Sequence, residues 1–146
     1  MSVSKPFVFA LVCESLGSEE ARRRLGVNST GLAFNSLQAI EQSRDGRTNP
    51  MVNPGAIATT SLVHGATAEA KWQLIHDGLS RFAGRPLSIN GEVYESASET
   101  NQQNRSIARL LQSYGHGGGI VTVAPGAAAY LARALGLDLF VSQPAT

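Results

Sequence analysis

The first part of the chain has an uninterrupted apolar run followed by a short amphipathic segment. An apolar run over residues 6–13 leads to Gly17, and this pattern predicts a helix that ends at the glycine. A shorter amphipathic segment follows, with Ser18 expected as its N-cap and Gly26 just beyond its close. Two consecutive helices are therefore predicted before residue 27.

Two more helices are predicted in the middle of the chain. Asn53 as N-cap and Pro54 at the first helical position predict a small-residue helix through about Leu62. The clearest helix covers residues 67–83, where apolar residues recur every three or four positions and Gly84 follows. Its predicted core face consists of Ala68, Trp72, Ile75, Leu79 and Phe82.

The next segment predicts a loop and then another helix. Residues 85–92 contain proline, asparagine and glycine, a composition typical of a loop. Ser96-x-x-Glu99 has the spacing of a capping box, which predicts a helix that runs to about Tyr114.

The character of the chain changes after Gly115. A glycine-rich stretch leads into β-branched residues, which predicts a short strand over residues 119–124. Residues 127–135 are alanine-rich and indicate a helix, and residues 137–141 fit a strand or a tail. The expected fold class is α/β (α+β), mostly helical and with little sheet.

Length and composition indicate one globular domain. The chain has 146 residues, of which 42% are hydrophobic and 16% charged, enough to bury a core. We expect a single domain over residues 1–146. Its helical part would cover residues 1–115, and residues 116–146 would add the short strand and a divergent C-terminal segment.

Charge gives no reason to expect nucleic acid or a membrane as a partner. The formal net charge is +1, so no strong field attracts phosphate groups. The most basic run, Arg22 to Arg24, follows Glu19 and Glu20 in an amphipathic segment, which indicates a solvated helix face.

The cysteine and histidine content points to a reducing compartment and to no metal. Cys13 is the only cysteine and can form no internal disulfide, which favours the cytoplasm. The apolar run over residues 6–13 is too short to span a bilayer, and no targeting segment is visible. The histidines show no recognisable ligand spacing, so neither a metal nor another cofactor is expected: His64, His76 and His116.

Candidate chemistry stands at the first residues, in the motif Ser2-x-x-Lys5. Residues three apart on a helix lie on the same face, so a neutral lysine amine there can take the proton of the serine hydroxyl. A motif this short arises easily by chance, so its meaning depends on the rest of the chain.

Several longer stretches accompany that motif, and together they resemble the serine-dependent glutaminases. That family has a β-lactamase-like fold and hydrolyses L-glutamine to L-glutamate and ammonia. The resemblance covers residues 1–115 almost continuously and continues in the glycine-rich stretch from residue 117. The stretches are Ser2 to Lys5, "FNS" at 34–36 with Glu41, "NPMVNPGAIATTSL" from 49, "DGLSRFAGRPLS" from 77, "TNQQNRSIARLLQSYG" from 100 and "GGGIVTVAPG" from 117.

The resemblance implies a role for five residues. Ser2 would be the acylated nucleophile and Lys5 its proton acceptor, while Asn53 and Asn104 would contact the bound L-glutamine. His116 aligns with a family residue whose backbone helps to form the oxyanion site. From the residues alone, Asn53 is equally well explained as a helix N-cap, and a specific hydrogen-bonding task is favoured for Asn104 because asparagine gains nothing inside a helix.

Two departures from the family pattern set this chain apart. A family glutamate that holds the substrate's amino group is replaced by Ala97, and two functional tyrosines have no counterpart because Gly115 runs directly into the glycine-rich stretch. The resemblance therefore implies a partial β-lactamase/transpeptidase-like fold in a truncated and internally deleted relative with impaired activity.

A non-catalytic glutaminase-like module or a gene fragment remains the alternative, and homo-oligomer formation stays open. A penicillin-recognising hydrolase is disfavoured because the chain has no Lys-Thr-Gly triad.

Overall fold

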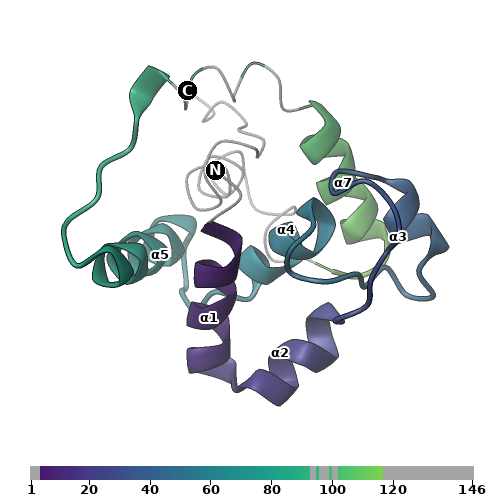
Figure 1. The fold of residues 1–146 in the computed structure, drawn as a ribbon, viewed down its shortest axis with the longest axis horizontal. Helices are drawn as coiled ribbons and strands as arrows, with labels where there is room; N and C mark the ends of the chain where they lie inside the picture. The colour runs from purple at the N-terminus through teal and green to yellow at the C-terminus, as the bar shows by residue number, and fades with distance from the viewer. Residues whose placement is uncertain (1–3, 93–94, 96–98, 100–101, 117–146) are drawn as a thin grey trace.

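The computed structural model describes residues 4–92, 95, 99 and 102–116 (Figure 1). Within these residues the chain folds into helices joined by loops. The helices are α1 (Ser4–Leu16), α2 (Ser18–Leu25), α3 (Gln38–Gln42), α4 (Asn53–Ser61), α5 (Ala68–Ala83) and α7 (Gln102–Ser113).

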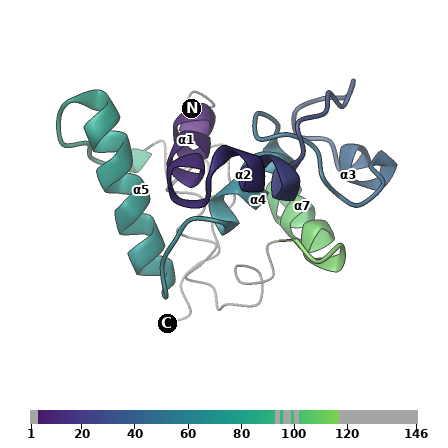
Figure 2. The same cartoon turned by 90° about the horizontal axis from the view of Figure 1, so that it is seen from below.

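Helix α1 lies between α5 and α4 (Figure 1). It contacts α5 on one side and α4 on the other, and α4 in turn packs against α7. Both Figure 1 and Figure 2 show the order α5, α1, α4, α7 across the molecule, with α2 beside α1 and α4. Segments about a hundred residues apart in sequence, the starts of α1 and α7, are thereby both joined to α4.

One apolar cluster connects these helices. Val8 and Val12 of α1, Ile75 of α5 and Ile107 of α7 are fully buried members of this cluster. Removing a side chain of this size from water stabilises the fold by about 1.5–3 kcal/mol, so the cluster is the main force that holds the helices together. The same cluster also includes Ala21, Ile40, Ala56, Ile57, Val63, Trp72, Ala108 and Leu111.

The predicted ends of α5 are confirmed. Thr67 is the N-cap, and its side chain accepts a hydrogen bond from the Ala70 backbone N–H at 3.1 Å. Gly84 adopts the left-handed conformation, φ 67°, that closes a helix without the steric cost of a Cβ.

Two details of the sequence prediction are wrong. Ser18 is the first helical residue of α2 rather than its N-cap, which is Gly17, and no side chain caps this helix. Phe82, in the last turn of α5, was expected in the core but is 53% exposed. There its ring packs on that of Phe7, at 5.0 Å between the ring centroids, and Phe7 is itself exposed.

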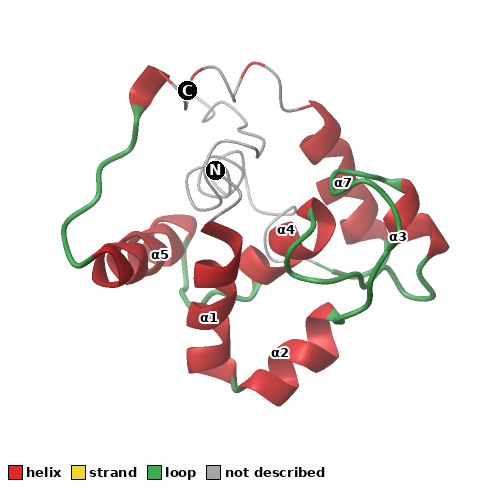
Figure 3. Cartoon of the chain, in the orientation of Figure 1, coloured by secondary structure: helices red, strands yellow, loops and turns green. Residues whose placement is uncertain are grey.

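The predicted α/β (α+β) fold class is also wrong for the part of the chain that is described. Figure 3 shows helices and loops there and no strand, and every buried apolar face belongs to a helix or a loop. The sheet expectation was based on residues 119–124, which lie outside the described residues, as do the segments 127–135 and 137–141. The helical pattern of residues 4–92 and 102–116 buries its apolar positions without a sheet partner.

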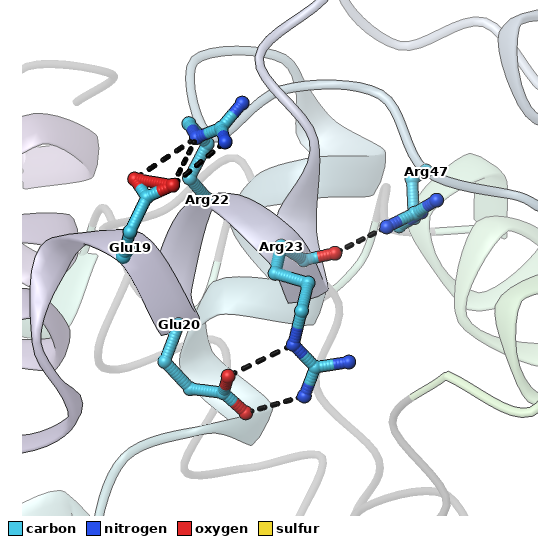
Figure 4. A network of polar contacts seen from close by, with 5 residues as sticks. All are labelled: Glu19, Glu20, Arg22, Arg23 and Arg47. Carbon is cyan, nitrogen blue, oxygen red and sulfur yellow. Dashed lines mark hydrogen bonds and ion pairs between the residues drawn. The ribbon is translucent and has the colours of Figure 1, made fainter.

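The basic run of α2 forms the solvated face that its charge pattern predicts. Arg22 pairs with Glu19 at 2.7 Å, and Arg23 pairs with Glu20 at 2.6 Å (Figure 4). Arg24 also pairs with Glu20, at 2.6 Å. The hydrogen bonds from Arg23 and Arg24 lower the pKa of Glu20 to about 2. The pairs are exposed to solvent, so each contributes little to stability.

Gly55 in the first turn of α4 provides a direct test of this packing. A Cβ at this position would lie 1.7 Å from the carbonyl oxygen of Asn49. We predict that Gly55→Ala lowers the free energy of unfolding by about 3 kcal/mol or more, because backbone must move to accept the methyl group. Gly91→Ala is the control, since a Cβ there meets no atom within 4 Å. Urea unfolding of both variants measures the difference, and equal stabilities would contradict the packing of α4 on Asn49.

Candidate active site

The first turn of α1 directs Lys5 into the interior. Lys5 lies on the same helix face as Val8 and Val12, and only 2% of its surface is exposed. Pro6, the next residue, is exposed and occupies the first turn, where a missing backbone N–H has no cost. A basic side chain is thus held on an apolar stripe.

The N-terminus of α4 presents Asn53 to the same region. Its backbone N–H donates to the carbonyl of Phe34 at 2.7 Å, and the residue is 2% exposed. The N-cap position of α4 belongs to Val52, and no side chain caps the helix. Of the two explanations that the sequence left open, capping is therefore not what the Asn53 side chain does here.

Helix α7 contributes Asn104 from its own apolar face. Asn104 shares that face with Ile107, Ala108 and Leu111, and it is 6% exposed. A polar side chain on such a stripe needs a partner, because an unpaired buried amide is costly.

The three buried side chains are joined in one hydrogen-bonded chain. Lys5 Nζ donates to Asn53 Oδ1 at 2.8 Å, and Asn53 Nδ2 donates to Asn104 Oδ1 at 2.8 Å. We call these residues the Lys–Asn–Asn chain. It connects the three helices α1, α4 and α7. Because hydrogen bonds are directional, the chain sets the positions of these helices more specifically than hydrophobic contacts alone.

The direction of these hydrogen bonds follows from the lysine. An ammonium group has only donors, so Asn53 must present its oxygen to Lys5 and its NH₂ group to Asn104. Asn104 must then accept through its own oxygen, which leaves its NH₂ group as the terminal donor of the chain. The arrangement suits a ligand with hydrogen-bond acceptors, such as a carboxylate or an amide carbonyl.

Phe34 is a neighbour of the chain that sequence reasoning left without a role. Its ring centroid lies 5.5 Å from Lys5 Nζ, within the range of a cation–π contact. The following residue, Asn35, accepts a hydrogen bond through its carbonyl from Gln103 Nε2 at 2.9 Å. No periodicity relates residue 34 to residue 5, and only the "FNS" stretch marked this segment.

The remaining predicted residues do not join this group in the described structure. Ser2 lies outside the described residues. The His116 backbone N–H donates to the carbonyl of Leu111 at 2.9 Å, and its Nε2 lies 2.6 Å from the carbonyl oxygen of Asp45. His116 lines a pocket with Ala58 and Ser61, near the end of α4 opposite to Asn53.

A pocket in the described part of the chain lies away from the Lys–Asn–Asn chain. It has a volume of about 610 Å³ and lies between α2 and the loops around residues 26–32 and 43–48. Four arginines line it, but Arg22, Arg23 and Arg47 are already paired with carboxylates. Its position and its satisfied charges separate it from the candidate chemistry.

The described residues form neither a metal-binding cluster nor a membrane-spanning helix. No group of three or more His, Cys, Asp and Glu side chains lies close enough to hold a metal ion there. No helix in the same part of the chain is both long and apolar enough to cross a membrane.

Comparison with known proteins decides the family. The glutaminase family model matches residues 1–117. The chain belongs to the glutaminase family. It is 69% identical over 115 residues to Glutaminase 2 of Yersinia pestis, covering 79% of this chain and 34% of that protein. It is 49% identical over 113 residues to the glutaminase of Colwellia psychrerythraea, covering 77% of this chain and 36% of that protein.

Solved glutaminase structures resemble the fold. The probable glutaminase ybaS superposes with a TM-score of 0.79 at 36% identity, covering 92% of this chain and 42% of that one. A Bacillus glutaminase superposes with a TM-score of 0.74 at 33% identity, covering 79% and 39% of the two chains. This glutaminase-family chain spans about a third of the length of the curated relatives it matches.

The Lys–Asn–Asn chain predicts a specific stability effect. Asn104→Leu removes the acceptor of Asn53 Nδ2 and leaves that buried donor unpaired. We expect the free energy of unfolding to fall by about 1–3 kcal/mol. Asn28→Ala, at an exposed position, should change it by less than about 0.5 kcal/mol. Similar values for the two variants in urea unfolding would show that the amide–amide hydrogen bond does not stabilise the fold.

Proposed function

We propose that this chain carries the acyl-transfer chemistry of a glutaminase and hydrolyses L-glutamine to L-glutamate and ammonia. The observation that supports it best is the hydrogen bond from buried Lys5 to Asn53, with Asn104 beyond. These are three of the residues that the family resemblance assigns to the site. Membership of the glutaminase family makes L-glutamine the proposed substrate.

The proposed reaction has two steps with Ser2 as the nucleophile. Lys5, as a neutral amine, takes the hydroxyl proton while the serine oxygen attacks the side-chain carbonyl carbon of glutamine. The C–N bond then breaks, the proton passes to the leaving nitrogen, and ammonia departs. Water next attacks the glutamyl ester with Lys5 as base, which releases glutamate and restores the serine.

The hydrogen bond to Asn53 gives Lys5 a defined orientation for this role. One N–H of the amine is held by Asn53 Oδ1, so the amine cannot rotate freely. In the proposed reaction this restrained amine takes the hydroxyl proton of Ser2. Holding a base and a nucleophile in reacting geometry is a large part of catalysis.

Substrate recognition is assigned to the two asparagines. The NH₂ group of Asn104 and the second N–H of Asn53 are the donors that a glutamine carboxylate or carbonyl would meet. His116 would supply an oxyanion donor only after its backbone hydrogen bond to Leu111 opens.

A non-catalytic glutaminase-like module is the second candidate. It is favoured by Ala97, which stands where the resemblance expects a glutamate for the substrate's amino group. Loss of several groups that act together is not additive, so we propose turnover well below that of a complete family member rather than none.

The setting of this activity is part of the same proposal. We place the chain in the cytoplasm, as one glutaminase-like domain over residues 1–146 with no cofactor. Its lone cysteine supports a reducing compartment, and its net charge of +1 supports neither nucleic acid nor an anionic membrane as a partner. Homo-oligomer formation stays open.

Acylation of Ser2 is the test that separates the two candidates. The full chain is incubated with L-γ-glutamyl-4-nitroanilide, and intact mass and peptide mapping locate the glutamyl adduct. We expect the adduct on Ser2 and slow release of ammonia from L-glutamine. Ser2→Ala should abolish both, whereas Ser15→Ala, at the far end of α1, should leave both unchanged.

Three results would decide against the enzyme. Equal ammonia release from the native chain and Ser2→Ala would exclude serine catalysis. An adduct on another residue would exclude Ser2 as the nucleophile. A folded chain that binds L-glutamine but forms no adduct would favour the non-catalytic module.

A further inference from the structure

We propose that Phe34 is a positioning residue that holds the Lys5 amine and the Asn53 backbone in register. This inference rests on the proposed function, because the position of Lys5 matters for catalysis only if Lys5 is the base. The evidence is the joint contact of one residue with both groups: its ring lies over Lys5 Nζ and its carbonyl accepts the Asn53 N–H.

The loop that carries Phe34 is anchored on both sides. The Asn53 N–H donates to the Phe34 carbonyl at 2.7 Å, which fixes the loop to the start of α4. Gln103 Nε2 donates to the Asn35 carbonyl at 2.9 Å, which fixes the next residue to α7 beside Asn104. A turn hydrogen bond from the Ser36 N–H to the Ala33 carbonyl, 3.1 Å, closes the segment. The ring is therefore held over Lys5 by a backbone that both asparagine-bearing helices support.

The ring interacts with Lys5 in a way that suits a base. Its negative face attracts an ammonium group at 5.5 Å without accepting a conventional hydrogen bond from it. A carboxylate in the same place would hold the proton of the lysine in an ion pair. An aromatic ring instead restrains the flexible lysine side chain more weakly, and it favours the ammonium form that Lys5 acquires when it takes the proton of the proposed nucleophile.

Phe34 is exposed, although the amine that it contacts is buried. Its surface is 54% exposed, while Lys5 beneath it is 2% exposed. A large aromatic side chain that stays half in water contributes less to stability than a buried one, yet here it covers a buried amine. Phe82 offers a matched comparison, since it is 53% exposed and its ring meets another phenylalanine instead.

NMR of the lysine side chains tests the contact without relying on activity. Lys5 and Lys71 are the only lysines, so lysine-labelled protein gives two sets of side-chain signals, and Lys71→Arg assigns them. A ring current shifts protons that lie over an aromatic face. We expect Phe34→Leu to move the Lys5 Hε resonances and to leave those of Lys71 in place, while Phe82→Leu moves neither.

The rate of glutamyl-adduct formation on Ser2 tests the consequence. Phe34→Leu keeps an apolar side chain and the backbone carbonyl but removes the π face. We expect adduct formation to slow by roughly 2- to 30-fold, the range that corresponds to loss of a cation–π contact. Phe34→Tyr should restore the rate because it keeps the ring, and Phe82→Leu should match the native chain.

The outcomes separate this inference from the proposed function. Unchanged Lys5 resonances in Phe34→Leu would overturn the positioning role, whatever the activity. Equal rates for Phe34→Leu and Phe34→Tyr, both below the native rate, would overturn it too, because any loss would then not depend on the ring. If the Lys5 resonances move but no variant is acylated, the contact stands and the proposed enzyme activity fails.

Discussion

The hydrogen bond between Lys5 and Asn53 is the constraint on which the site depends. A lysine amine that is almost fully removed from water needs a partner, and the Asn53 carbonyl oxygen provides one at 2.8 Å. Because Lys5 can only donate as an ammonium, this one contact sets the orientation of Asn53 and then of Asn104. The same contact fixes how the start of α1 meets the start of α4. Removal of either partner would cost the other buried group this hydrogen bond, so the contact favours this arrangement of the two helices.

The surrounding core supports this polar chain at little cost to itself. Val8, Ile107 and their neighbours fill the space below it, so that Lys5 and Asn104 occupy positions on otherwise apolar helix faces. The charged residues of α2 lie on the outside, where their ion pairs are solvated. The apolar cluster thus provides most of the stability, and the Lys–Asn–Asn chain carries the candidate chemistry. A free energy of several kcal/mol from the core can tolerate one satisfied polar chain.

Sequence patterns predicted the elements better than their contacts. Helix α5 follows from its apolar period, its Thr67 cap and its terminal Gly84, all of which act locally. Phe82 has the same period but is exposed, since periodicity alone does not determine which residues of a helix another element covers. The sheet expectation came from local β propensity, which does not provide a pairing partner. Local sequence patterns therefore predict where a helix begins and ends, but they do not predict which of its residues are buried or whether a strand finds a partner.

The site shows the same division. Asn104 could be suspected from the sequence, because an amide three residues before Ile107 interrupts an apolar stripe. The pairing of Lys5 with Asn53, 48 residues apart, depends on how α1 packs against α4, and no period encodes it. The sequence pattern did not identify Phe34 as a site residue for the same reason. Hydrogen bonds from the loop around Phe34 to two distant helices determine where it lies. The family resemblance supplied the candidates, and the structure supplied their mutual geometry.

A double-mutant cycle between Lys5→Met and Asn53→Leu measures the central contact most directly. The free energy of unfolding is determined in urea for the native chain, the two single variants and the double variant. The account predicts a coupling energy of about 1–3 kcal/mol, because each single variant leaves a buried polar partner that the double variant removes. Additive effects, with a coupling energy near zero, would contradict it.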